Sequence, residues 1–60
     1  MKDAEKFAKT NVIDKRTDIE VLLTNSGAVI VGEEVFGLTW ATFPDGSEIG
    51  FTDKNEIEVN

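Results

Sequence analysis

Residues 36–51 read FGLTWATFPDGSEIGF, and in this stretch two β-prone runs flank the turn sequence Pro44-Asp45-Gly46. Aromatic and β-branched residues on both sides of a Pro/Gly turn predict a β-hairpin. The stretch also holds the only tryptophan, Trp40, and three of the four phenylalanines. We therefore expect the rest of the chain to be arranged around this hairpin.

The hairpin can form in two registers. If Asp45-Gly46 is a two-residue turn, Trp40 lies opposite Phe51. If Pro44-Asp45-Gly46 is a three-residue loop, Trp40 lies opposite Gly50. Proline suits the second position of a type I turn and glycine suits the positive φ that follows, so we favour the three-residue loop. The choice matters because a shift of one residue exchanges the two faces of the sheet.

In the favoured register both faces of the sheet are apolar. One face, the expected core, carries Thr39, Ala41, Phe43, Ile49, Phe51, Ile57 and Val59. The other face carries Phe36, Leu38, Trp40, Leu22 and Ile30. We expect an N-terminal helix to cover part of this second face with Ala4, Phe7 and Ala8. Whatever stays uncovered is a candidate interface, so Trp40 is either core beneath the helix or a binding hot spot.

The chain predicts a single domain over residues 1–60. A helix is indicated over 3–10, with Asp3 as its cap. Strands are expected over 19–24, 28–31, 35–43, 47–52 and 56–59. The predicted fold class is mainly β (α+β): the short helix, then a five-stranded antiparallel meander curled into a small SH3-like barrel. The alternative is an open five-stranded sheet with the helix on one face.

Besides the loop at Pro44-Asp45-Gly46, three polar turns connect the predicted strands. Asn25-Ser26-Gly27 would join the first two strands, with Gly27 in a left-handed conformation. This pairing would place Val29 and Val31 on the core face, beside Leu23 and Val21. Gly32-Glu33-Glu34 is expected to be an exposed break, and Asn55 is expected to take a left-handed conformation in the last turn.

The net charge of −6 is concentrated in the second half of the chain. Residues 1–32 hold five acids and five bases, whereas residues 33–60 hold seven acids and one base, Lys54. An acidic half repels phosphate backbones, so nucleic-acid binding is disfavoured. A protein partner with a basic surface is electrostatically easier.

The sequence offers no catalytic or metal-binding constellation. It has no histidine and no cysteine, which removes the common nucleophile–base pairs and the usual zinc ligands. We therefore expect no enzymatic activity, no metal and no cofactor. No run approaches the ~20 apolar residues of a membrane span. Without cysteine or an apolar signal segment, we expect a cytoplasmic protein.

The leading hypothesis is a small acidic, non-enzymatic protein-interaction domain that acts as a regulator, an inhibitor or an accessory subunit. Its partner-binding residues would be Phe36, Leu38 and Trp40, rimmed by Glu48, Glu56 and Glu58. A sharper version is a nucleic-acid mimic, whose carboxylates occupy the basic groove of a DNA- or RNA-handling protein. One alternative is a nucleic-acid-binding small β-barrel that uses Lys2, Lys6, Lys9, Lys15 and Arg16. The other is a self-associating structural subunit, a homo-oligomer that pairs its uncovered face with its own copy.

Overall fold

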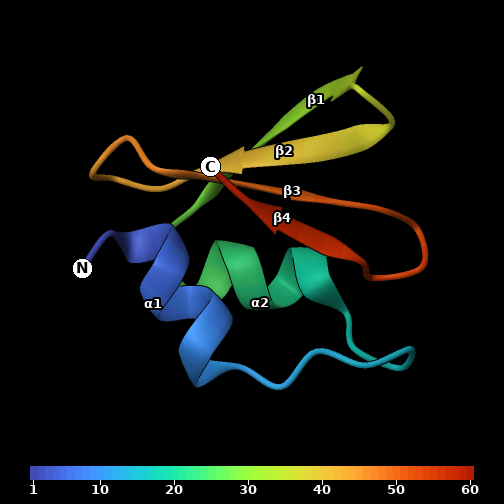
Figure 1. The fold of residues 1–60 in the computed structure, drawn as a ribbon, viewed down its shortest axis with the longest axis horizontal. Helices are drawn as coiled ribbons and strands as arrows, with labels where there is room; N and C mark the ends of the chain where they lie inside the picture. Colours follow the sequence, from blue (N-terminus) through green and yellow to red (C-terminus); the bar gives the residue numbers. More distant parts are fainter.

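The structure is a computed structural model that describes all residues, 1–60, as two helices followed by four strands (Figure 1). The elements are α1 (Asp3–Thr10), α2 (Ile19–Asn25), β1 (Val29–Val35), β2 (Leu38–Thr42), β3 (Glu48–Phe51) and β4 (Ile57–Val59). The strands form one antiparallel sheet in the order β1-β2-β3-β4. Both helices lie on the same side of this sheet (Figure 1). The fold is therefore mainly β, with two helices beneath an open four-stranded sheet.

The stretch 19–24, predicted as a strand, is helix α2. Asp18 caps it by accepting a hydrogen bond from the Val21 N–H at 3.3 Å. Ile19, Leu22 and Leu23 all pack into the core, and they recur at the three- and four-residue spacing of a helix. The alternation of apolar residues that suggested a strand was misleading because Leu22, on the supposed opposite face, is apolar too.

The C-terminus of α2 is a Schellman motif where a hairpin turn was expected. The Ala28 N–H donates to the Leu23 carbonyl at 3.0 Å, and the Gly27 N–H donates to the Thr24 carbonyl at 3.1 Å. This motif needs a left-handed residue after the helix, and Gly27 has a φ of +89°. The left-handed conformation of Gly27 is thus confirmed, although it ends a helix.

Strand β1 pairs with β2, because the strand expected to pair with it is a helix. Ile30 lies opposite Ala41 and Val31 lies opposite Trp40. Ile30 therefore faces the core, while Val29 and Val31 face away from it. These faces are the reverse of the prediction, since residues directly opposite each other point to the same side of a sheet.

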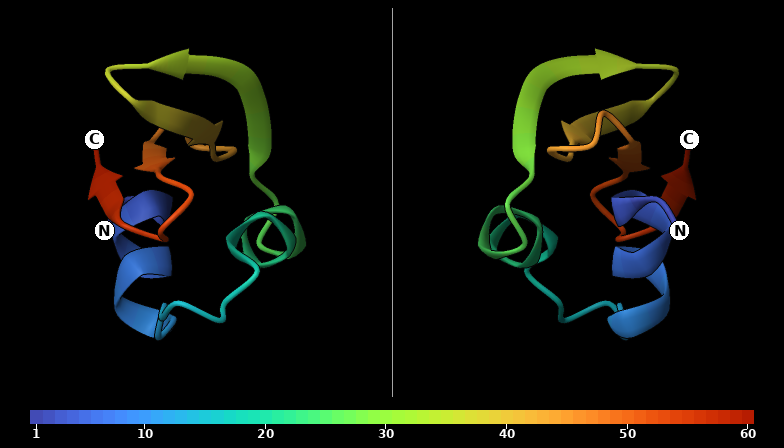
Figure 2. Two further views of the ribbon diagram at one scale, coloured as in Figure 1. Left: turned by 90° about the vertical axis from the view of Figure 1, so that its right-hand side faces the viewer. Right: turned by 90° about the vertical axis from the view of Figure 1, so that its left-hand side faces the viewer.

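The predicted break at residues 32–34 is a bulge inside β1. Val31 lies opposite Trp40 and Glu34 lies opposite Thr39, so two residues of β1 have no partner on β2. Bulges bend a strand and increase its twist. Figure 2 shows β1 rising from α2 and then turning across the top of the sheet.

The chain reverses at Phe36-Gly37, where a continuous strand over 35–43 was predicted. Val35 ends β1 and pairs with Leu38, which begins β2. Phe36 and Gly37 have φ values of +56° and +76°, so both turn residues are left-handed. This is a two-residue hairpin of the mirror-image type, which matches the twist of the flanking strands.

The β2–β3 hairpin has the favoured register. The Phe43 N–H donates to the Ser47 carbonyl at 2.8 Å and the Gly46 N–H donates to the Phe43 carbonyl at 2.9 Å. Gly46 has a φ of +89°. The three-residue loop is confirmed, and Trp40 lies opposite Gly50 as predicted.

The core lies between the sheet and the two helices. Its buried apolar residues are Ala4, Phe7, Ile19, Leu23, Ala28, Ala41, Phe43, Ile49 and Phe51. The Phe7 ring packs on Phe43, with 5.7 Å between ring centroids. Helix α1 therefore covers the Phe43 face. The expectation that it would cover Trp40 is wrong.

The β2–β3 loop holds the start of α1 in place. The Ala4 N–H donates to Ser47 Oγ at 3.0 Å, and the Asp3 N–H donates to Asp45 Oδ2 at 2.8 Å. These bonds satisfy N–H groups that a helix leaves unpaired at its start. Asp3 was expected to cap the helix, but it is the first helical residue and is itself capped by Asp45.

The β3–β4 turn is tied to the connection between the helices. Asn55 is left-handed as predicted, with a φ of +61°. Its Nδ2 donates to the carbonyls of Asp14 and Thr17, both at 2.7 Å. The turn therefore fixes a segment that has no regular structure of its own.

The five-stranded barrel is not formed. With residues 19–24 helical, four strands remain, and β1 and β4 are free edges of an open sheet. The helices cover the side of the sheet that a barrel would have closed upon itself. The meander order and the antiparallel pairing are confirmed.

Candidate functional site

The candidate site is the side of the sheet that the helices leave uncovered, which we call the open face. By register it carries Val29, Val31, Val35, Leu38, Trp40, Thr42, Glu48, Gly50 and Glu58. Phe36 lies at its edge, in the β1–β2 turn. Eight large apolar residues of the chain are exposed, and four of them, Val29, Val31, Val35 and Phe36, belong to β1 and this turn. Half of the exposed large apolar residues of the chain therefore lie on the open face or at its edge.

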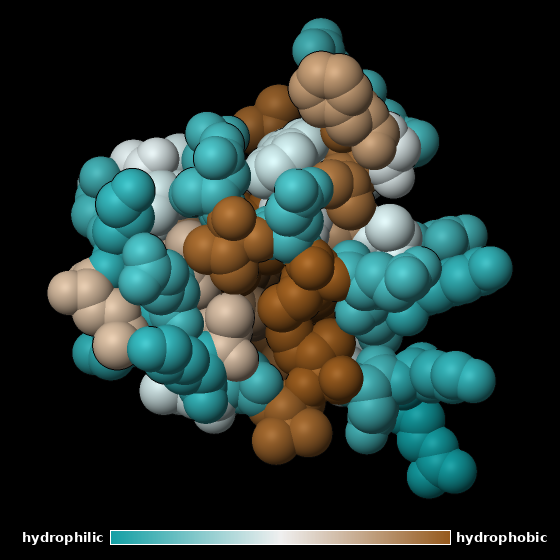
Figure 3. Space-filling view, viewed as in Figure 1, coloured by the Kyte–Doolittle hydropathy of each residue, from teal (hydrophilic) through white to brown (hydrophobic).

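Apolar side chains are also exposed elsewhere on the surface. Figure 3 shows a band of them beside α1, as well as a group at the outer end of the β1–β2 hairpin. Away from β1 and its turn, the exposed large apolar residues are Met1, Val12, Val21 and Val59, which come from four different segments. Single exposed apolar residues are normal on a protein surface.

Phe36 is held in an unusual conformation. It is 94% exposed, and its φ of +56° is uncommon for a bulky side chain. In a two-residue turn of this type, asparagine, aspartate or glycine is strongly preferred at that position. The phenylalanine therefore gains little from burial and carries backbone strain, a combination that packing within this chain does not explain.

Trp40 lies flat against the sheet because Gly50 has no side chain. A Cβ atom at Gly50 would stand 3.1 Å from Trp40 Cε2 and 3.1 Å from Leu38 Cβ. The indole Nε1–H donates to the Val35 carbonyl at 3.1 Å, which fixes the rotation of the ring. The ring therefore packs over Gly50, the residue that the favoured register places opposite Trp40.

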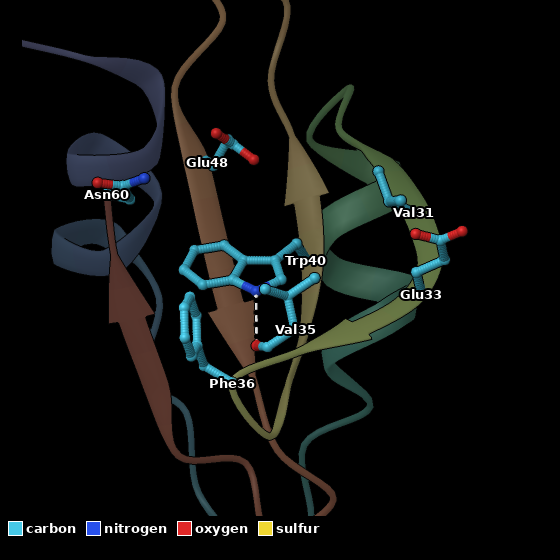
Figure 4. Close-up of a pocket in the computed structure, with 7 residues that line it drawn as sticks. All are labelled: Val31, Glu33, Val35, Phe36, Trp40, Glu48 and Asn60. Carbon is cyan, nitrogen blue, oxygen red and sulfur yellow. Dashed lines mark hydrogen bonds between the residues drawn. The ribbon is translucent and has the colours of Figure 1, made fainter.

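A hollow of about 300 Å³ opens beside these aromatic rings. It is lined by Val31, Glu33, Val35, Phe36, Trp40, Glu48 and Asn60. Figure 4 looks onto the face of the Trp40 indole, with the Phe36 ring beside it. Glu48 and Glu33 lie on different sides of the indole (Figure 4). The bulge and the turn of β1 create this hollow, because they bring Phe36 round to the open face.

The structure brings some of the predicted site residues together and leaves others apart. Phe36, Trp40 and Glu48 line the hollow. Leu38 packs beside Trp40 over Gly50, and Glu58 lies on the open face opposite Gly50. Glu56 precedes β4 and does not line the hollow.

Sequence reasoning missed the other four lining residues, Val31, Glu33, Val35 and Asn60. Val31 was assigned to the core, and Glu33 was assigned to a plain turn. Gly32 could have suggested a bulge, since a glycine inside a strand pattern often marks one. Nothing in the sequence pattern places Asn60 beside Trp40.

One carboxylate with a shifted pKa lies away from the hollow. The Asp3 N–H, the Ser47 hydroxyl and the Ser47 N–H all donate to Asp45, and they hold its pKa below the ordinary value. This carboxylate caps α1. Its perturbation is therefore explained by the architecture of the fold.

No group of three acidic side chains lies close enough to hold a metal ion. Neither helix has the length or the apolar character to cross a membrane. Comparisons with protein-family models, with curated proteins and with solved structures find no match to this chain. Its function is therefore inferred from the geometry of the open face.

Proposed function

We propose that this chain is a non-enzymatic protein-interaction domain, a regulator, an inhibitor or an accessory subunit, that binds a protein partner through the open face. The observation that carries this proposal is Phe36, which is 94% exposed and has a φ of +56°. Strain of this kind costs about 1–3 kcal/mol and clusters at functional sites. A partner that covers the Phe36 ring would supply the burial that the isolated chain lacks.

Trp40 is a second reason to propose the open face as the binding surface. It is partly exposed, and both helices pack on the opposite side of the sheet (Figure 2). Tryptophan is enriched among the residues that contribute most to binding energy at protein interfaces. Leu38 and the outward valines of β1 extend the apolar area around it.

The acidic rim favours a partner with a basic surface. Glu48 and Glu58 lie on the open face, and Glu56 stands just before β4. A nucleic-acid mimic is the more specific form of this proposal. In that form, changing Glu48, Glu56 and Glu58 together to glutamine should weaken binding at low salt. Unchanged binding would contradict the mimicry and leave the apolar contact in place.

The proposal that the protein is non-enzymatic and cytoplasmic rests on composition. The chain has no histidine and no cysteine, so its catalytic options are few and a reducing compartment suits it.

The proposal is tested by comparing Phe36→Asn with Val12→Asn in a tagged chain exposed to extract of the native cell. Val12 is 90% exposed but lies between α1 and α2, so its variant removes a similar apolar surface elsewhere. A captured protein would be purified and its dissociation constant measured. We expect about a 10-fold or larger weakening for Phe36→Asn and no change for Val12→Asn.

Two results would contradict the proposal. In the first, no purified protein distinguishes the two variants. In the second, light scattering shows that the wild-type chain is a dimer and that Phe36→Asn is a monomer, which would assign the open face to a second copy.

A further inference from the structure

We propose that the hollow between Trp40 and Phe36 binds an arginine side chain of the protein partner, with Glu48 and Glu33 as its counter-charges. The inference rests on the proposed function and specifies what the open face recognises. A volume of about 300 Å³ is at the lower limit of ordinary small-molecule pockets. It suits one inserted side chain better than a free metabolite.

The aromatic rings provide the first part of such a site. The indole of Trp40 is fixed from behind by Gly50 and from its edge by the bond to the Val35 carbonyl. Because Nε1–H is already used, what the ring offers to a ligand is its π face. Figure 4 shows this face toward the hollow, with the Phe36 ring next to it. A cation over the face of tryptophan is attracted by the ring quadrupole.

The charges provide the second part. Both ionisable residues that line the hollow, Glu33 and Glu48, are acids, and they lie on different sides of the indole (Figure 4). Both carboxylates attract a cation in the hollow, whereas they repel an anion. The net charge of −6 adds to the same preference.

Arginine fits these features better than lysine. Its guanidinium is planar, stacks on aromatic rings, donates two hydrogen bonds to a carboxylate and is more weakly hydrated than an ammonium group. Its methylene stem can lie along apolar surface, which Val31 and Val35 provide in the lining. A second copy of this chain is a poorer occupant, because face-to-face pairing sets Glu33 and Glu48 against their own equivalents.

The single tryptophan makes the test direct, since all tryptophan emission of this protein arises in the hollow. The probe is the capped peptide acetyl-Gly-Arg-Gly-amide, compared with the same peptide carrying citrulline, a neutral side chain of nearly the same shape. We expect saturable changes in emission, with binding about 10-fold tighter for arginine than for citrulline and intermediate for lysine. Glu48→Gln should remove most of that ratio, whereas the control Glu56→Gln should preserve it.

Equal binding of the arginine and citrulline peptides, or no change in emission with either, would overturn the inference. So would self-association of the wild-type chain that Arg16→Gln abolishes, because the hollow would then take the arginine of another copy. These outcomes are separate from the test of the proposed function. A partner that is lost in Phe36→Asn supports the interaction domain even if the arginine peptide does not bind.

Discussion

The two faces of the sheet are built from the same hairpin, and they differ in what covers them. On the core face Ala41, Phe43 and Ile49 are buried beneath the helices, and Phe43 contacts Phe7 directly. On the open face the alternating residues Leu38 and Trp40 are only partly buried. Both faces are rich in apolar residues, so apolar content does not distinguish core from interface. Asp45 and Ser47 contribute to the distinction, because they attach the start of α1 on the core side of the sheet.

The largest expected change in the free energy of unfolding comes from truncating a buried apolar residue on the core side, and an exposed apolar residue of the open face is the comparison. Leu23 is fully buried between α2 and the sheet, so Leu23→Ala should lower the free energy of unfolding by about 2–5 kcal/mol. Val29 is 68% exposed on the open face, and Val29→Ala should cost less than about 0.5 kcal/mol. Urea denaturation followed by circular dichroism measures both.

This pair of substitutions tests whether the open face is uncovered while the core face is buried. For a chain of 60 residues the total free energy of unfolding is about 3–9 kcal/mol, so Leu23→Ala should remove a large share of it. A cost for Val29→Ala that depends on protein concentration would mean that the open face is covered by a second copy.

A smaller effect is expected where the open face meets the backbone. Gly50→Ala places a Cβ atom 3.1 Å from Leu38 Cβ, which cannot move far, and 3.1 Å from Trp40. We expect a loss of about 1–2 kcal/mol and a red shift of Trp40 emission as the indole is displaced. Gly32→Ala is the matched control, because nothing lies within 4 Å of its added Cβ atom. A Gly50→Ala variant as stable as Gly32→Ala would show that Trp40 is free to leave the sheet.

The attachment of α1 to the core face should depend on pH. Hydrogen bonds hold the pKa of Asp45 below its ordinary value, so the folded state favours the ionised carboxylate. The resulting stabilisation is complete above the ordinary pKa and is lost as pH falls through the folded pKa, that is, below about pH 4. Asp45→Asn should reduce this acid sensitivity, and the difference is measured from urea midpoints at pH 3 to 6. An Asp45→Asn variant with the same acid sensitivity as wild type would assign it to other carboxylates.

Local turn chemistry made the central hairpin predictable. Proline followed by Asp-Gly has a strong preference for one loop type, and that loop fixes the register and therefore the two faces. Gly27 and Asn55 were also identified correctly, because a left-handed backbone restricts the choice of residue.

The mistakes came from tertiary pairing. A short run such as Ile19–Asn25 satisfies both the helical and the strand period, and only the cap from Asp18 and the packing of Leu23 decide between them. Once that run is a helix, β1 changes partner and its faces are exchanged. The candidate site was therefore predicted only in part. Phe36, Trp40 and Glu48 were identified, but Glu33 was not, because the bulge that places it in the lining has no strong local signal in the sequence.

The smallest expected effect has the opposite sign and separates the open face from the core most sharply. Phe36→Asn places a residue that tolerates a positive φ in a turn that prefers it, and it removes an exposed ring. We expect it to raise the free energy of unfolding by about 0.5–1 kcal/mol while weakening partner binding. Phe36→Ala keeps the strained backbone and removes the same ring, so it should weaken binding without the gain in stability. Truncating a core residue should not behave in this way, because removing a side chain that is buried in the isolated chain lowers the free energy of unfolding. If Phe36→Asn instead destabilised the protein, the Phe36 ring would have to be packed in the free chain, and the open face would belong to the core after all.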